Sequence, residues 1–279
     1  MKHLCKLLYL ITLLLLTGCT TKLPIIAVQL SDDDGNNRAP VTPQEIEHWV
    51  NRANTSWKGS GYKFTFDPDK DIIQVSSTVL NSKPDDAANP QWELYRLTGN
   101  YLASLLPRHQ IPVLFRQRGQ TGWSGGPGHS NFISMPSYSN TCIKKQTGGA
   151  CRGGCCPDDT LLAHQLGHYL GLVHTNTNVP CDKVKAEIAD GDRQGWFANN
   201  KEDDIRDTAP DPGANCAPTT SADCDTGKVK IKNGNSFRPP WRNVMSAHNC
   251  LPEQISGDQE DAVEWVLENN PWRQQIGND

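Results

Sequence analysis

Apolar runs alternate with helical patterns along the N-terminal half of the chain. The segment LPIIAVQL at residues 23–30 has the continuous, branched apolar character of a buried strand. In residues 41–57 apolar positions recur at helical spacing, after Thr42 as a suitable N-cap and Pro43 at the first helical position. This pattern predicts an amphipathic helix packed on a sheet. Its buried face is expected to hold Ile46, Trp49, Val50 and Ala53.

The alternation continues towards the middle of the chain. Residues 62–78 predict two short strands about a DPDKD turn, residues 92–106 a second helix and residues 111–117 another strand. The run NFISMP at residues 131–136 is typical of an edge strand. Strands that alternate with helices in this way predict an α/β sheet with helices against it.

A glycine-rich stretch, residues 119–131, interrupts this alternation. It lacks the lysine and the following helix of a phosphate-binding P-loop, so we expect a loop at the rim of the domain. His129 within it is a weak candidate for a catalytic role. His48 on the first helix is expected at the surface or at an interface.

Two long stretches, residues 142–156 and 175–240, are polar and lack periodicity. Loops this long inside a domain are usually functional or tied down. Helical spacing resumes at residues 255–270, where Ser256 is a suitable N-cap. The expected apolar positions of this last helix are Ala262, Trp265 and Val266.

Composition limits the class of protein. With 279 residues, 36% of them hydrophobic, the chain is long enough for one large domain. Its formal net charge of −4 argues against nucleic acid as the main partner, because phosphate binding needs a basic surface. The oligomeric state does not follow from these features.

The first residues have the pattern of a targeting segment. Lys2 and Lys6 precede an apolar run at residues 7–16, which is too short for a permanent membrane span. The sequence LTGC then follows at residues 16–19. An ordinary secretory signal with an incidental cysteine is one interpretation of this pattern.

The other interpretation is a bacterial lipobox, which the segment resembles. It predicts a signal peptide over residues 1–18 and a single mature domain over residues 19–279, with a lipid on Cys19. Thr20 after the cysteine resembles the pattern for delivery to the outer membrane. The protein would then be exported to the cell envelope and anchored to a membrane rather than spanning it.

Eight further cysteines remain when Cys5 and Cys19 are set aside. An even number in an exported chain indicates disulfide bonds, although the first four also suit a thiolate metal cluster, and the sequence does not fix the pairing. They are Cys142, Cys151, Cys155, Cys156, Cys181, Cys216, Cys224 and Cys250.

The segment HQLGHYLGLVH at residues 164–174 carries the candidate chemistry. His164 and His168 are four residues apart on a predicted helix and therefore project from one face. Gly171 permits a sharp turn that brings His174 back towards them. Three neutral imidazoles suit zinc and leave a fourth position for water, although they also admit other transition metals. A core helix that merely contains histidines is the alternative.

These residues resemble the metzincin metallopeptidases, whose signature is HExxHxxGxxH, and within them the pappalysin family. HT at residues 174–175, DDIRDTAP at residues 203–210 and NVMS at residues 243–246 follow the family's order. The last of these resembles the Met-turn under the metal, with Met245 as its methionine. The segment from Cys250 resembles the family's approach to its last helix.

The resemblance implies a two-lobed α/β (α+β) fold with a twisted mixed sheet and two long helices above a cleft. The upper lobe would span about residues 23–171, and a disulfide-tied, irregular lower lobe would span about residues 172–279. An extended peptide or protein would lie antiparallel to the edge strand, around Asn131 to Met135.

Calcium and disulfide positions are also implied by the resemblance. Asp203, Asp204 and Asp207 offer oxygen ligands for calcium, although a solvated acidic loop explains them equally well. The family's bridges imply the pairs Cys181 with Cys224 and Cys216 with Cys250.

Gln165 departs from the family, which has a glutamate there as the general base for a zinc-bound water. Glutamine has nearly the same shape but cannot accept the proton. General-base assistance contributes a factor of about 10² to 10⁴ in rate, so hydrolysis is expected to be weakened or abolished. Two residues after Met245, this chain has Ala247 where many family members carry a tyrosine. The neighbouring His248 could offer a hydrogen-bond donor instead, but a solvent-facing turn residue is the simpler interpretation.

Three interpretations of Gln165 remain open. It is native in a pseudoenzyme that binds peptides, it is an engineered change in an active endopeptidase, or another base replaces the glutamate. A surface lipoprotein that binds partners without any metal is a hypothesis of a different class. The three histidines argue against it, because without an ion they have no function.

Overall fold

The computed structural model describes residues 20–84, 88–141, 157–175, 205, 240–246 and 254–278. It also describes the backbone of four two-residue strands. These strands form two antiparallel pairs, β6 (Ile143–Lys144) with β7 (Cys155–Cys156) and β8 (Val229–Lys230) with β9 (Ser236–Phe237). No helix in this part of the chain is long and apolar enough to cross a membrane.

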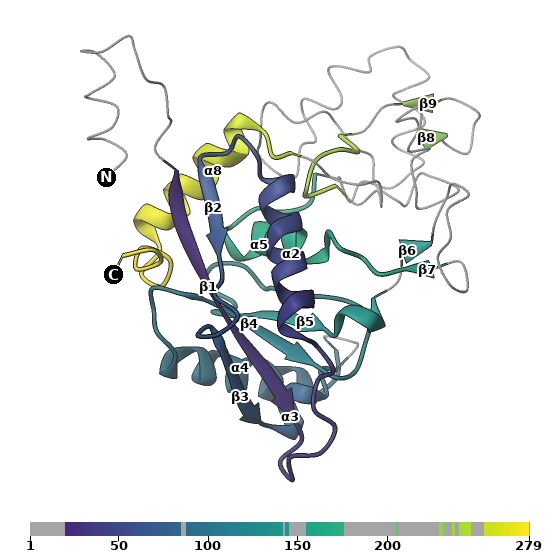
Figure 1. Cartoon of the computed structure of the whole chain (residues 1–279). Helices are drawn as coiled ribbons and strands as arrows, with labels where there is room; N and C mark the ends of the chain where they lie inside the picture. The colour runs from purple at the N-terminus through teal and green to yellow at the C-terminus, as the bar shows by residue number, and fades with distance from the viewer. Residues whose placement is uncertain are drawn as a thin grey trace.

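The centre of the molecule is a five-stranded sheet built around β1 (Thr21–Ser31) (Figure 1). β4 (Ile111–Arg116) lies along one side of β1, with β5 (Ile133–Pro136) beyond it. β2 (Tyr62–Thr65) and β3 (Ile72–Ser76) follow one another along the other side of β1. The predicted strands are thus confirmed, and the DPDKD turn carries the chain onward along β1 instead of folding it into a hairpin.

The mixed sheet that we expected is parallel in every pairing between its named strands. α2 (Pro43–Ser56) lies between β1 and β2 in the chain, and α3 (Thr78–Asn81) and α4 (Gln91–Leu105) lie between β3 and β4; crossover connections of this kind produce parallel pairs. The one antiparallel contact of this sheet among the described residues is a bridge between Trp123 and Ser134. Through Trp123, the glycine-rich stretch therefore pairs with the outer side of β5 at this one position.

Two helices cover one face of the sheet. α2 (Pro43–Ser56) begins with a capping box in which the Thr42 hydroxyl accepts from the Glu45 amide and the Glu45 carboxylate accepts from the Thr42 amide. With α5 (Leu161–Tyr169) it shares one hydrophobic cluster with alternate residues of β1. The expected apolar face of α2 is confirmed, because Ile46, Trp49, Val50 and Ala53 are all buried.

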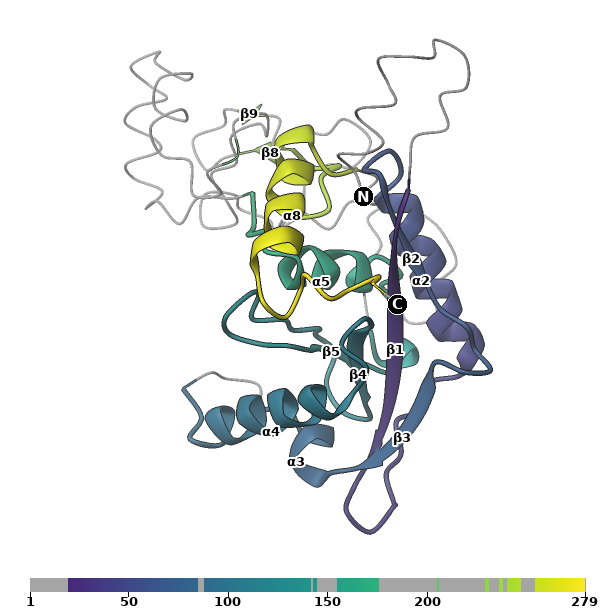
Figure 2. The same ribbon diagram turned by 90° about the vertical axis from the view of Figure 1, so that its left-hand side faces the viewer.

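The other long helix covers the opposite face. α4 (Gln91–Leu105) and the short α3 (Thr78–Asn81) pack on a second cluster that contains Val28 and Leu30 of β1. Figure 2 shows α4 and α3 well separated from α2. The two long helices, α2 and α4, thus lie on opposite faces of the sheet, and the helix that packs beside α2 is the shorter α5.

The C-terminal segment packs back on the core formed by the N-terminal half. α8 (Gly257–Asn269) starts at Ser256 as predicted, and its Val263 belongs to the same cluster as Leu23. Trp265 was expected on the apolar face, yet it is 64% exposed; Val263 takes that place. Much of the predicted lower lobe lies outside the described residues, so the division into lobes stays a prediction.

Candidate metal centre

The helix that carries two of the histidines is fixed at its start by α2. Trp49 donates from its indole nitrogen to the Asp158 carbonyl oxygen at 2.9 Å, and Trp57 donates to the Ala163 carbonyl oxygen at 3.3 Å. The Asp158 carboxylate accepts from the amide and the hydroxyl of Thr160, the residue that directly precedes α5. Leu162 and Leu166 then bury the opposite side of α5 in the core.

A turn at Gly171 brings the third histidine back to the helix. Gly171 has φ +96°, a conformation that residues with a side chain rarely adopt. The Leu172 amide donates to the Gly167 carbonyl oxygen at 2.9 Å, which closes the turn. His174 therefore approaches His164 and His168 from outside the helix, as the sequence predicts.

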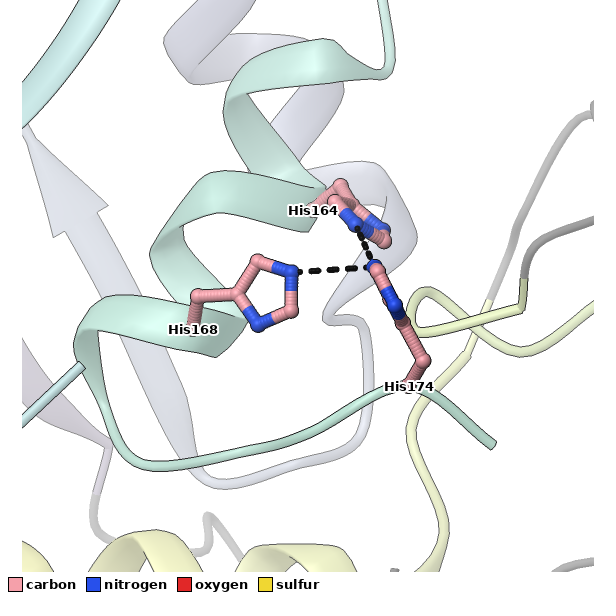
Figure 3. Close-up of side chains that lie close together, drawn as sticks. All are labelled: His164, His168 and His174. Carbon is pink, nitrogen blue, oxygen red and sulfur yellow. Dashed lines mark hydrogen bonds between the residues drawn. The ribbon is translucent and has the colours of Figure 1, made fainter. Parts of the chain in front are cut away.

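The three imidazoles point at one another (Figure 3). Nε2 of His174 lies 3.0 Å from Nε2 of His164 and 3.1 Å from Nε2 of His168. The described residues contain no other group of three or more His, Cys, Asp or Glu side chains arranged to hold an ion. This arrangement argues against the interpretation of a core helix with incidental histidines.

Backbone carbonyls determine which nitrogens face inwards. Nδ1 of His164 lies 2.7 Å from the Val244 carbonyl oxygen, and Nδ1 of His168 lies 2.9 Å from the Leu172 carbonyl oxygen. A carbonyl only accepts, so each Nδ1 carries the proton and each Nε2 of a neutral ring presents a lone pair. If His174 Nε2 carries a proton, that proton can bond to only one of the two Nε2 lone pairs of His164 and His168. A cation shared by the three Nε2 atoms would satisfy all three rings.

The pKa values favour the same protonation state. Burial lowers the pKa of His164 to about 3 and that of His168 to about 4, and the neighbouring imidazoles act in the same direction. Partial burial also lowers the pKa of His174. The rings are therefore neutral near pH 7, which is the form that binds a metal.

Met245, the residue assigned to a Met-turn, packs against α5 at Gly167. It is fully buried, and its carbonyl oxygen accepts from the Thr175 amide at 3.1 Å, next to the third histidine. A Cβ on Gly167 would lie 2.2 Å from the Met245 sulfur, so this close approach requires glycine. No pattern in the sequence singled out Gly167 or Val244 for these roles.

Gln165 is buried beside the histidines. Its Oε1 atom has no hydrogen-bond partner among the residues that the structure describes. Its side chain packs on Gly122, where an added Cβ would lie 2.8 Å from the Gln165 Cγ atom. A buried acceptor without a partner is expensive unless water or a ligand satisfies it.

The edge of the sheet nearest this glutamine differs from the prediction. Trp123 and Ser134 exchange two backbone hydrogen bonds of 2.8 Å, so β5 is not free at Ser134. The expectation that a peptide pairs directly with residues 131–135 is therefore wrong there. This bridge uses both backbone groups of Trp123, so the outer edge is offered by the flanking backbone groups of Gly122 and Ser124. The Trp123 ring is held by Trp92 and Phe132.

The remaining candidates lie apart from the histidines or outside the described residues. His48 is exposed and 3.5 Å from the Asp159 carboxylate, as expected of a surface residue, and His129 is exposed. For Cys155 and Cys156 only the backbone is described. Outside the described residues lie Cys19, Cys142, Cys151, Cys181, Cys216, Cys224, Cys250, Asp203, Asp204, Asp207, Ala247 and His248.

The sequence matches no protein-family model and no curated protein. Its structure is similar to mature mirolysin from Tannerella forsythia in complex with a cleaved peptide, with 13% identity, coverage of 93% of this chain and 96% of the other, and a TM-score of 0.53. A mirolysin complex with a compound matches at 11% identity, 93% and 96% coverage and a TM-score of 0.54. A Tannerella forsythia promirolysin mutant matches at 14% identity, with coverage of 93% of this chain and 85% of the other and a TM-score of 0.50.

The chain therefore shares the overall fold of mirolysin. At this level of identity the similarity establishes the fold alone. Activity therefore has to be argued from the residues of this chain.

Proposed function

We propose that this protein is a zinc-binding, pappalysin-like relative of the metallopeptidases that binds extended peptides and hydrolyses them weakly or not at all. The observation that supports the proposal is the position of His174 Nε2, which lies 3.0 Å from Nε2 of His164 and 3.1 Å from Nε2 of His168, while carbonyls hold the Nδ1 atoms of His164 and His168. His164, His168 and His174 would be the ligands. Neutral nitrogen donors with ordered outer partners suit zinc.

Zinc bound there would act as a Lewis acid for a peptide carbonyl and for water. The chain's own contribution is orientation: Gln165 offers an amide oxygen that can accept a hydrogen bond but cannot take a proton away. The peptide would pair with the backbone of Gly122 and Ser124, on the outer side of the bridge at Trp123, which would supply affinity without demanding a particular sequence. The protein would therefore hold peptides more effectively than it cleaves them.

An active endopeptidase lineage is the second candidate, and the unpartnered Gln165 oxygen supports it. A glutamate of the same length would place a carboxylate oxygen in that position, beside the histidines. An engineered Glu-to-Gln change or another base would both belong to this lineage. The metal-free binding protein has less support, because it leaves three inward-facing imidazoles without a function.

The proposal extends to the cell envelope and to the irregular segments. The apolar run and Cys19 support export with a lipid anchor at the bacterial outer membrane, and the even number of cysteines supports disulfide bonds. The acidic residues Asp203, Asp204 and Asp207 support a calcium site. These parts depend on the sequence alone.

A paired assay tests the proposed function. Zinc-loaded wild-type protein and Gln165→Glu would be compared on an unfolded protein substrate, with and without a chelator. We expect Gln165→Glu to cleave about 10² to 10⁴ times faster, in a chelator-sensitive manner. Equal rates for the two proteins would contradict the role given to the glutamine and favour an independent base.

A further inference from the structure

Two buried amide side chains join the last helix to the Met-turn. Asn243 donates from Nδ2 to Gln259 Oε1 at 2.7 Å, and Gln259 donates from Nε2 to Asn243 Oδ1 at 3.2 Å. Gln259 is 0% exposed and Asn243 is 5% exposed. Each amide thus satisfies the other in a closed pair, which is the condition under which burial of such groups is tolerated.

Each oxygen of the pair accepts a second hydrogen bond from the backbone. Asn243 Oδ1 accepts from the Met245 amide at 2.8 Å, and Gln259 Oε1 accepts from the Ser256 amide at 2.9 Å. Gln259 is also the N3 residue of the α8 capping box, and its backbone amide donates to the Ser256 hydroxyl. The start of α8 and the Met-turn are consequently fixed to each other at one point.

This point lies one residue from an outer contact of the histidine cluster. Val244, between Asn243 and Met245, presents the carbonyl oxygen that holds Nδ1 of His164 at 2.7 Å. The Val244 amide is itself anchored to the Gln254 carbonyl oxygen at 2.9 Å. Loss of the amide pair would free the Val244 peptide to rotate, and with it the only described acceptor for the His164 Nδ1 proton.

We propose that Gln259 and Asn243 are positioning residues for the metal centre, through which α8 orients His164. The inference rests on the proposed function, because it concerns the affinity of the three histidines for zinc. Outer partners of metal-bound histidines typically change metal affinity about 10- to 100-fold when they are replaced. A pair whose role is only to stabilise α8 would leave that affinity unchanged.

The experiment measures the zinc dissociation constant of the full chain by competition with a chelator. Gln259→Met keeps the length of the side chain and removes the three hydrogen bonds that this side chain makes with Asn243 and the Ser256 amide. We expect zinc binding to weaken about 10- to 100-fold. Gln259→Glu keeps both accepted hydrogen bonds but replaces the donor to Asn243 by a second oxygen and brings an acidic group into a buried position. It is a second variant for the case in which Gln259→Met fails to fold, and circular dichroism verifies its own fold. For Gln259→Glu we expect the same direction of change and an altered cobalt(II) absorption spectrum.

Glu45→Met is the matched control, because Glu45 is the N3 residue of the other capping box, on α2. It should lower thermal stability without changing zinc affinity or the cobalt spectrum. If the Gln259 variants fold and bind zinc as tightly as wild type, the inference is overturned while the proposed function stands. If wild-type protein binds no zinc, the proposed function fails and the inference fails with it.

Discussion

The sulfur atom of Met245 fills the space that a side chain on Gly167 would occupy. A Cβ built on Gly167 would lie 2.2 Å from this sulfur, well inside van der Waals contact. Because both residues are buried, neither has room to move away without disturbing the core. The helix of the histidines and the turn beneath it therefore approach as closely as a glycine allows.

This contact predicts the effect of Gly167→Ala. The added methyl group would push Met245 and the Val244 carbonyl away from α5, and overpacking of this kind costs about 1–3 kcal/mol. We expect a lower midpoint in denaturant unfolding and weaker zinc binding in the same variant. Gly167→Ala together with Met245→Ala should recover part of both losses, and no recovery would argue against a direct clash.

The close contact between Gly122 and Gln165 predicts a variant that loses cleavage but keeps its affinity for zinc. Gly122→Ala would place a Cβ 2.8 Å from the Gln165 Cγ atom, so the side chain at position 165 would have to move. In the Gln165→Glu background we expect about 10-fold or greater loss of cleavage, since small misplacements of a reacting group are costly. Zinc affinity should not change. Thr121→Ala, at an exposed neighbour, should leave both quantities unaltered.

The hydrogen bonds of Arg273 are expected to make a large contribution to the stability of the fold around the site. Its guanidinium is fully buried and donates to the carbonyl oxygens of Tyr169 and Ser130 and to the Asn131 side chain. Arg273→Met leaves these acceptors without their donor, and we expect a loss of about 2 kcal/mol or more in the free energy of unfolding. Arg108→Met removes an exposed cation–π contact with Trp272 and should cost less than about 1 kcal/mol. Similar losses for the two variants would contradict this ranking.

Acidification should destabilise the metal-free protein. Burial lowers the pKa of His164 to about 3 and that of His168 to about 4, whereas an unfolded histidine titrates near about 6.5. Between these values the unfolded chain binds protons that the folded chain does not, so stability is highest above about pH 6.5 and falls as the pH decreases towards about 4. Denaturant unfolding as a function of pH measures this loss.

His168→Asn provides the control for this pH dependence. It removes one of the depressed groups, so its stability should fall less steeply with acidification than that of wild type. An identical slope in the two proteins would show that other groups cause the loss.

The elements near the site were predictable because their signals are local. Periodicity and capping identified α2, α4 and α8, and the spacing of His164, His168 and His174 with Gly171 between them identified the convergence of the imidazoles. These features depend on residues close together in the sequence. The buried face of α8 was predicted less well, since helical spacing alone did not distinguish Val263 from Trp265.

Contacts between distant segments were not predictable in the same way. The hydrogen bond from His164 to Val244 joins residues 80 positions apart, and the contact of Gln165 with Gly122 joins two segments that carry no shared pattern. The free edge was assigned to β5 because an apolar run marks a strand, whereas Trp123 forms only a single bridge. Backbone pairing of so short a segment leaves no periodicity to detect.

The zinc content of the purified full chain tests the central claim most directly. Elemental analysis would follow loading with zinc and removal of the excess, for wild-type protein and for His168→Ala with its fold verified by circular dichroism. The account predicts about one zinc per wild-type chain, as a single three-histidine site requires, and a strong loss in the variant. Wild-type protein without zinc, or a variant that retains it fully, would contradict the account.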